Sequence, residues 1–324
     1  MADAALSLDP VRKASSDPGR QASLPAAPGL RLRVREITEA DHAEVALLLA
    51  RGFQRPVWYY AEALRRLSRH ATPPGFPKYG LLMEADGNPV GAVLLIFSTV
   101  RSGGHRQTRC NVTSWYVEPA YKNYATMFSS RAFRYRDVTY INISARPVAR
   151  PIIKAQGFLS YSRGQHVAVP AFHSGPRQER VRICEVDAPL DVPFEASDRE
   201  LLLAHADFGC MSLWCVTKER AYPVVLLPRF FKRLLPGVQL IYCRDIGDLV
   251  RFAGPLGRFL ALRGKFVISI DSNGPVPGLI GKYIDGKSPR FFKGPTPPRL
   301  GDLSYTQGAM FPWPWPSGID PSAG

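Results

Sequence analysis

The sequence predicts an α/β protein, and three observations lead to this fold class. The chain has 324 residues, of which 45% are hydrophobic and 21% are charged, a balance typical of a globular protein with a sizeable core. Runs with the alternation of β-strands are interleaved with runs whose apolar residues recur at helical spacing. The second half of the chain also repeats part of the order of the first half. We therefore expect one large domain or two ordinary ones.

The first block of elements begins with an alternating strand at residues 30–38. A helix follows, because Thr38 and Asp41 have the spacing of a capping box ahead of an apolar stripe, and Pro56 then opens a second helix. A tight turn at residues 86–88 lies between two apolar runs, which indicates a hairpin. The sequence next predicts a strand at 109–117, a helix at 120–136, a buried strand at 138–144, a short helix at 150–156 ended by Gly157, and a strand at 166–172.

The second block has a similar layout. It is predicted to contain a helix at 198–208, strands at 212–217, 222–228 and 238–243, a helical region at 245–264, and a strand at 265–271. Residues 288–307 indicate a strand pair around a Pro-rich loop, with a basic and aromatic binding segment as the alternative. Residues 134–148 and 261–276 both join a basic helix end to an apolar strand and then to a Pro-Val pair. This similarity indicates a divergent tandem repeat of one α/β unit. Chance similarity between two α/β blocks is the alternative.

Composition divides the chain into five segments. Residues 1–29 are rich in Ala, Ser, Asp and Pro without periodicity, which predicts a disordered tail. Residues 30–172 form the first predicted domain, residues 173–180 a polar linker that contains Gly and Pro, and residues 181–311 the second domain. Prolines are too frequent in residues 312–324 for a helix or a central strand, so we expect a second tail there.

The net charge of +15 at pH 7 indicates an anionic partner, such as nucleic acid, a membrane surface or a phosphorylated cofactor. The sequence contains no run of five or more like charges, so the charge alone does not select among these partners. The five cysteines contain no CxxC pair and the six histidines have no metal-ligand spacing. We therefore expect buried, reduced thiols and neither a disulfide framework nor a metal site. Without a signal-peptide pattern or an apolar run long enough to cross a bilayer, the expected location is the cytoplasm.

Two motifs carry a resemblance to a known family. WYVEPAYKNYA at residues 115–125 joins a strand end to a helix start, and KAQGF at residues 154–158 ends the short helix. With the order of elements around them, residues 30–172 resemble the GCN5-related N-acetyltransferase (GNAT) family of acyltransferases. The resemblance implies a mixed, mostly antiparallel central sheet flanked by helices. It also implies, as in some members, two tandem units of which the second is degenerate.

The resemblance further implies a site for acyl-coenzyme A (acyl-CoA) at the end of one strand. Trp115, Tyr116 and Val117 match the strand whose backbone pairs with the pantetheine arm. One N–H of this strand, which we place at Val117, polarises the thioester carbonyl in the family, an oxyanion site built from the main chain. The pyrophosphate loop of the family falls on the start of the following helix, at Lys122, Asn123, Tyr124 and Ala125.

The sequence departs from the family pattern in this loop. Lys122 keeps a cation where the family has Arg or Gln, but Ala125 and Met127 replace the two positions that are normally small. The backbone N–H groups of a helix start survive these changes, whereas close approach of a phosphate depends on the side chains. An ordinary helix start is therefore the alternative interpretation.

The groups that move protons are less well marked. Ile153 stands where many members have a Tyr that protonates the departing thiolate, so Tyr161 is a candidate substitute, with a buried structural Tyr as the alternative. Glu118 is a candidate to accept the proton of the attacking amine, or else a surface carboxylate. Asn142 and Ser144 alternate on a core strand, where they either bond the pantetheine amides or stitch the strand to its neighbour.

The predicted function is direct transfer of an acyl group from acetyl-CoA or a longer acyl-CoA to an amine acceptor. The rival hypothesis is a catalytically inactive GNAT-like protein that binds an anionic partner. For that hypothesis the charge of the chain suits nucleic acid, an acidic lipid or the acidic surface of an acyl-carrier protein.

Overall fold

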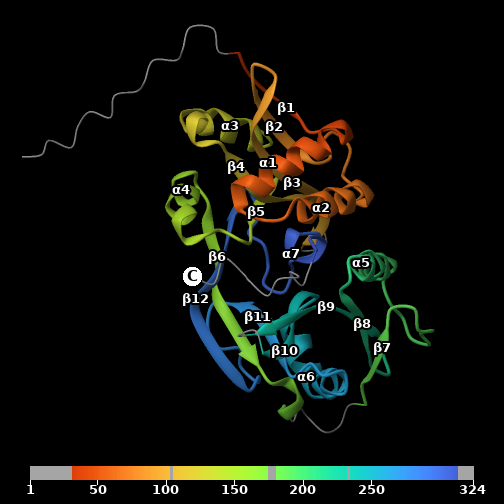
Figure 1. Ribbon diagram of the computed structural model, residues 1–324. Helices are drawn as coiled ribbons and strands as arrows, with labels where there is room; N and C mark the ends of the chain where they lie inside the picture. The colour runs from red at the N-terminus through yellow and green to blue at the C-terminus, as the bar shows by residue number, and fades with distance from the viewer. Residues whose placement is uncertain (1–30, 103–104, 174–179, 232–233, 313–324) are drawn as a thin grey trace, which may run out of the picture.

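The computed structural model describes residues 31–102, 105–173, 180–231 and 234–312 (Figure 1). The tail predicted at residues 1–29 lies outside the described residues. So do residues 174–179 of the predicted linker and all but the first residue of the predicted Pro-rich tail.

The described chain is built on one 12-stranded sheet with the order β1-β2-β3-β4-β5-β12-β6-β11-β10-β9-β8-β7. Neighbouring strands are antiparallel except in two pairs, β4–β5 and β10–β11, which are parallel. This mixed, mostly antiparallel sheet is the fold class that the sequence predicts. The strands are β1 Leu32–Glu36, β2 Gly80–Ala85, β3 Asn88–Ser102, β4 His105–Val117, β5 Thr139–Asn142, β6 Leu159–Ala168, β7 Arg182–Glu185, β8 Met211–Val216, β9 Ala221–Phe231, β10 Leu235–Cys243, β11 Val267–Ser272 and β12 Gly281–Lys293.

The strand order is symmetric about the pair formed by β12 and β6. Five strands, β1 to β5, lie on one side of this pair, and five strands, β11 to β7, lie on the other in the reverse order. β6 follows β5 in the chain but pairs with β11, whereas β12 follows β11 but pairs with β5. Each half thus passes its last strand to the other half, and Figure 1 shows these two strands running side by side between the halves. The arrangement fits two tandem units that exchange a strand.

Helices cover both faces of the sheet. In the first half, α1 (His42–Phe53) and α2 (Val57–Arg69) pack on one face, and α3 (Ala125–Ala132) and α4 (Arg150–Ala155) pack on the other. In the second half, α6 (Ile246–Ala261) covers one face, while α5 (Ala196–Asp207) and α7 (Gln307–Met310) join a core shared by both halves. The short 3₁₀ helices are η1 Glu39–Asp41, η2 Pro119–Tyr124, η3 Pro147–Ala149 and η4 Pro170–Phe172.

Local signals in the sequence are confirmed where the chain turns or starts a helix. Thr38 and Asp41 form the capping box ahead of α1, and Pro56 precedes α2. The hairpin between β2 and β3 turns at Asp86 and Gly87, whose φ angles of 49° and 84° suit a two-residue turn. Gly157 ends α4 with a φ of 84°, a conformation that other residues rarely adopt.

Three predictions about elements are wrong in extent. The helix predicted at residues 120–136 is a 3₁₀ turn followed by α3, which ends at Ala132. The chain leaves the helix at Phe133, because the ring of Phe133 packs among three other aromatic rings. Its centroid lies 5.6 Å from that of Trp115, 5.1 Å from that of Tyr140 and 5.3 Å from that of Phe158. The strand predicted at 166–172 is β6, which begins at residue 159 and ends before Pro170 starts η4. The strand pair predicted around a Pro-rich loop at residues 288–307 is a single strand, β12, which begins at residue 281 and ends at residue 293.

All five cysteines are buried and free, as expected, and burial raises the pKa of Cys110 well above its ordinary value. Within the described ranges, the helices are too short or too polar for one to cross a bilayer.

Candidate functional site

The strands β4 and β5 form a fork. β5 pairs with β4 only where Thr139–Ile141 lie beside Arg109–Asn111. β4 then continues to Val117 and pairs with β3 alone, whereas β5 ends at Asn142, so the two parallel strands are unpaired beyond Asn111. We call this opening the first fork. In the part of the chain that the structure describes, no strand pairs with the β5-facing edge of residues 112–117.

A bulge in β4 shapes the open edge. Thr113 pairs with Leu94 and Tyr116 pairs with Ala92, so that two residues of β4 lie opposite Val93 alone. One of them, Ser114, has a φ of 50°, in the left-handed region that bulges use. Such a bulge bends the strand and increases its twist, which helps β4 to turn away from β5.

The hydrogen bonds to β3 determine where the backbone of Val117 points. The N–H of Glu118 donates to the carbonyl of Val90 on β3 at 2.8 Å. Successive residues of a strand direct their N–H and C=O groups to opposite neighbours. The N–H of Val117 therefore points away from β3, into the first fork, where a ligand carbonyl can accept its hydrogen bond.

The side chains at the end of β4 are occupied by packing. The ring centroid of Trp115 lies 5.9 Å from that of Phe128 on α3. The ring of Tyr116 lies on the opposite face of the sheet, with its centroid 6.2 Å from that of Phe53 on α1. Val117 also packs against the α3 side of the sheet. Of the three residues predicted to hold pantetheine, the fork thus offers main-chain groups rather than side chains.

The predicted pyrophosphate loop is η2 and the first turn of α3. Lys122 and Asn123 are exposed, Tyr124 is half-buried, and Met127 is 39% exposed. The N–H of Ala125 already donates to the carbonyl of Lys122, because the 3₁₀ turn runs directly into α3. Its amide therefore cannot serve a phosphate without breaking that bond. Met127 does not plug the fork, because its side chain lies at the surface.

The elements that follow the two diverging strands are rich in cations. Residues 119–158 contain seven Lys or Arg residues and a single acid, Asp137. Lys122 belongs to η2 after β4, and Arg150 and Lys154 belong to α4 after β5. Both sides of the fork's mouth thus carry positive charge, which attracts an anionic ligand.

The proton-transfer candidates lie in different environments. Glu118 precedes η2 and forms an ion pair with Arg51, Oε1 to Nη2 2.5 Å, at a partly exposed site where such pairs contribute little stability. Tyr161 is buried beside Phe292, with a centroid distance of 6.2 Å, and among the described residues its hydroxyl has no hydrogen-bond partner. Burial raises the pKa of Tyr161, so it stays protonated. Ile153 packs in the core and offers no proton.

Four polar residues meet at the base of the first fork. The carboxamide of Asn111 donates to the carbonyl of Ile141 at 3.2 Å and accepts from the N–H of Gln307 at 2.8 Å. Gln307 Nε2 in turn donates to Ser144 Oγ at 2.6 Å, just beyond the end of β5. The Asn142 carboxamide accepts from the N–H of Ser144 at 3.2 Å. Asn142 and Ser144, both predicted to hold the cofactor, are thus brought to the fork but bond within the chain.

A second fork exists in the other half of the sheet, and the chain itself occupies it. β11 pairs with β10 only over three residues, Gly237–Gln239 with Val267–Ser269, and β10 carries a bulge after Leu240. Beyond this point the N–H of Leu303 donates to the carbonyl of Ile241 at 2.7 Å, and the N–H of Cys243 donates to the carbonyl of Gly301 at 3.0 Å. Because β9 holds the other edge of β10, residues 301–303 lie where a second ligand would pair.

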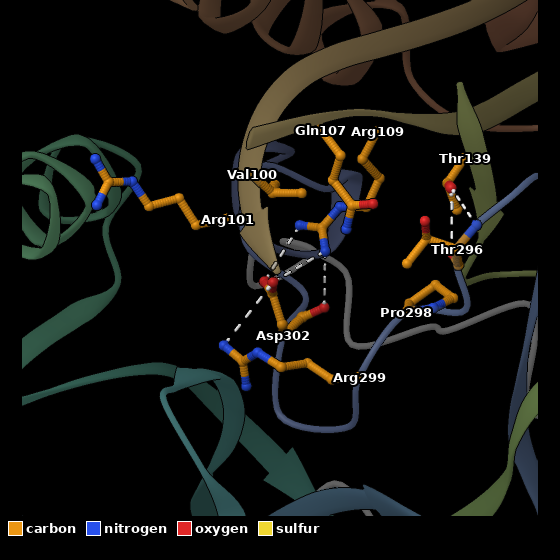
Figure 2. Close-up of a pocket in the computed structure, with 9 residues that line it drawn as sticks. All are labelled: Val100, Arg101, Gln107, Arg109, Thr139, Thr296, Pro298, Arg299 and Asp302. Carbon is orange, nitrogen blue, oxygen red and sulfur yellow. Dashed lines mark hydrogen bonds and ion pairs between the residues drawn. The ribbon is translucent and has the colours of Figure 1, made fainter. Parts of the chain in front are cut away.

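Charged side chains fasten this segment to the first half. Asp302, 5% exposed, pairs with Arg109 of β4 at 3.1 Å and with Arg299 at 3.9 Å (Figure 2). Burial favours a raised pKa for Asp302, but the two guanidinium groups outweigh it and hold the pKa at about 2. A small pocket over this cluster, lined by Val100, Gln107 and Thr139 among others, lies where β4 and β5 are still paired, away from the open end of the first fork.

Sequence reasoning missed Asn111, Gln307 and Asp302. Asn111 is a polar residue within an apolar strand, a pattern that indicates a buried hydrogen-bond partner. Gln307 and Asp302 carry no comparable signal, because their partners lie 196 and 193 residues away in the chain.

No protein-family model matches this sequence, and no curated protein matches it. Solved structures do resemble its fold. A GCN5-related N-acetyltransferase from Anabaena variabilis is 8% identical at a TM-score of 0.51, with 81% of this chain and 72% of that one covered. A GCN5-related N-acetyltransferase from Kribbella flavida is 12% identical at a TM-score of 0.50, covering 81% and 71%. A probable N-acyltransferase from Enterococcus faecalis is 11% identical at 0.50, covering 85% and 74%. The chain therefore has the fold of the GCN5-related N-acetyltransferases.

Proposed function

We propose that this protein is an acyl-CoA-dependent acyltransferase whose cofactor site is the first fork. The observation that carries the proposal is the separation of β4 from β5 after three residue pairs, which leaves the N–H of Val117 directed into the opening. A pantetheine arm laid along this edge would extend the sheet, and cations on both sides of the mouth would face its phosphates. The fold, which is that of N-acetyltransferases, agrees with this function.

The geometry supports direct transfer to an amine. With the thioester carbonyl bonded to the N–H of Val117, a neutral amine attacks the carbonyl carbon and forms a tetrahedral oxyanion. A main-chain donor that is already oriented stabilises this charge without reorganisation. The C–S bond then breaks, the CoA sulfur leaves as a thiolate, and the nitrogen loses its proton. A thiol has an ordinary pKa of about 8.5, so its thiolate can leave with little help from an acid.

Glu118 and Tyr161 remain candidates for the proton transfers. Glu118 adjoins Val117 and is held by a single exposed cation, so it can turn toward an incoming amine. Tyr161 is a proton donor by its protonation state. It lies on β6, which β12 separates from β5.

Only one of the two forks is open to a ligand. Residues 301–303 bond the free edge of β10 in the second fork, so a cofactor there would have to displace buried main chain. We therefore assign one acyl-CoA site to each chain.

A second candidate function is a non-catalytic binder of an anionic partner. It is favoured by the N–H of Ala125, which is already bonded, and by Ile153 in place of a proton donor. Under this alternative, the basic surface binds nucleic acid, acidic lipid or acyl-carrier protein with a steep dependence on salt.

Calorimetric titration with acetyl-CoA and longer acyl-CoAs tests the proposal. We expect saturable binding with one site per chain, followed by release of free CoA thiol when amine acceptors are added. Absence of heat with every acyl-CoA, together with salt-dependent binding of nucleic acid or acidic vesicles, would establish the alternative.

A further inference from the structure

Gln307 joins the two strands of the first fork through one main-chain and one side-chain hydrogen bond. Its backbone N–H is held by Asn111, the last β4 residue that pairs with β5, and its Nε2 reaches Ser144 beyond the end of β5. The residue therefore spans the fork at its base. Figure 1 shows that α7, which begins with Gln307, lies beside α2 and the end of β5.

The oxygen of the Gln307 carboxamide has no partner. Among the described residues, Gln307 Oε1 has no hydrogen-bond partner, although it is sealed from solvent. A buried carbonyl oxygen without a partner lowers the stability of a folded protein, and native proteins keep few of them. Because Gln307 lies at the base of the first fork, a ligand in the fork can supply the missing donor.

Contacts with both halves of the protein hold Gln307 in this place. Residues 301–303 are bonded into the second fork, and Asp302 is paired with Arg109. Ser304 is tied to the same Arg109, whose Nη2 donates to the Ser304 carbonyl at 2.6 Å. The N–H of Tyr305 donates to His205 Nε2 at 3.1 Å. These successive anchors leave Gln307 two residues further on, at the base of the first fork.

We propose that Gln307 is a cofactor-binding residue of the first fork, and that its free amide end bonds an amide of the pantetheine arm. The proposal rests on the function proposed above. Pantetheine contains two secondary amides, each with one N–H donor. Gln307 Nε2 can stay bonded to Ser144 Oγ while Oε1 accepts the N–H of such an amide.

The second unit then has a definite role. It does not bind a cofactor of its own, because its fork is filled by residues 301–303. It uses that fork to anchor the segment that carries Gln307 into the other fork.

Replacement of Gln307 by Leu tests the proposal, because Leu has a similar size and no polar atoms. In the empty protein, Gln307→Leu removes both the unpaired oxygen and the hydrogen bond to Ser144, an exposed residue that can bond water instead. In the complex, it also removes the proposed hydrogen bond to the ligand. We expect the melting temperature to change little, because the loss of the bond to Ser144 and the loss of the unpaired oxygen have opposite effects. The Kd for acetyl-CoA should increase about 5-fold, the effect of one neutral hydrogen bond.

Gln107→Leu is the matched control. Gln107 is a half-buried Gln on β4, but it lines the small pocket away from the open end of the first fork. It should leave the affinity for acetyl-CoA unchanged. The inference is overturned if Gln307→Leu binds acetyl-CoA as tightly as the natural protein. It is also overturned if the variant loses affinity only together with its thermal stability, or if only the KM for the amine changes. Failure of the natural protein to bind acetyl-CoA would instead remove the proposed function itself.

Discussion

The buried ion pair between Arg109 and Asp302 allows a quantitative test of how the two halves are joined. Both side chains are almost fully buried, with 5% and 6% of their surface exposed, and their closest atoms, Arg109 Nη1 and Asp302 Oδ2, are 3.1 Å apart. Asp302 Oδ1 also accepts a hydrogen bond from Ser304 Oγ at 2.6 Å. Replacing Asp302 by Asn keeps the shape of the side chain but removes its charge.

Asp302→Asn leaves the guanidinium of Arg109 buried and uncompensated, because Arg109 has no other carboxylate partner among the described residues. Breaking a buried pair in this way costs about 3–5 kcal/mol of unfolding free energy. Arg299→Gln is the control, since Arg299 is 30% exposed and lies 3.9 Å from Asp302, so its loss should cost less than about 1 kcal/mol. The double variant Arg109→Met, Asp302→Leu removes both charges and should recover most of the loss.

Urea unfolding followed by circular dichroism measures these differences, provided that the variants share one m-value. This interpretation of the pair is refuted if the unfolding free energy of Asp302→Asn lies within about 1 kcal/mol of that of the natural protein. It is also refuted if the double variant is no more stable than Asp302→Asn.

Three further predictions follow from the fold and the site. His205 is held neutral, with Nδ1 bonded to the Leu201 carbonyl, and burial lowers its pKa to about 4. Because the unfolded state then binds the proton more readily than the folded state, the unfolding free energy should fall by up to about 3 kcal/mol from pH 6.5 to pH 4. His205→Gln should flatten this pH dependence, as measured by urea unfolding. Residues 1–172 expressed alone should not fold, since β6 pairs only with β11 and β12; a dispersed NMR spectrum of this fragment would contradict the strand exchange. Met127→Ala should change the unfolding free energy by no more than about 0.5 kcal/mol, because the side chain is exposed. If the phosphates bind at the start of α3, as proposed, the smaller side chain should tighten acetyl-CoA binding in calorimetry, and weaker binding would place the phosphates elsewhere.

The parts of the fold that depend on neighbouring residues could be predicted from the sequence. The capping box at Thr38 and Asp41, the turn at Asp86 and Gly87, and the end of α4 at Gly157 each depend on side chains within a few positions. The order of the strands and helices up to β11 follows from the same kind of pattern, apart from β7. The resemblance of residues 30–172 to the GNAT family rested on that order and is confirmed at the level of the fold.

The strand exchange and the filling of the second fork could not be predicted in this way. β12 pairs with β5 through Phe291 and Asn142, which are far apart in the chain, and register between such strands leaves no local pattern. The candidate site likewise contains residues that a local motif marks and residues that only long-range contacts bring in. Val117 could be proposed from the sequence because a motif surrounds it, whereas Gln307 depends on a contact with Asn111 across 196 residues.

Amide hydrogen exchange with and without acetyl-CoA tests the central claim most directly, because it reports on the two forks in one experiment. If the cofactor lies along β4, exchange at residues 115–117 slows when acetyl-CoA is added, while the amides of residues 241–243, already covered by the chain, keep their rates. Unchanged exchange at residues 115–117, or new protection confined to residues 241–243, would show that the first fork is not where the cofactor binds.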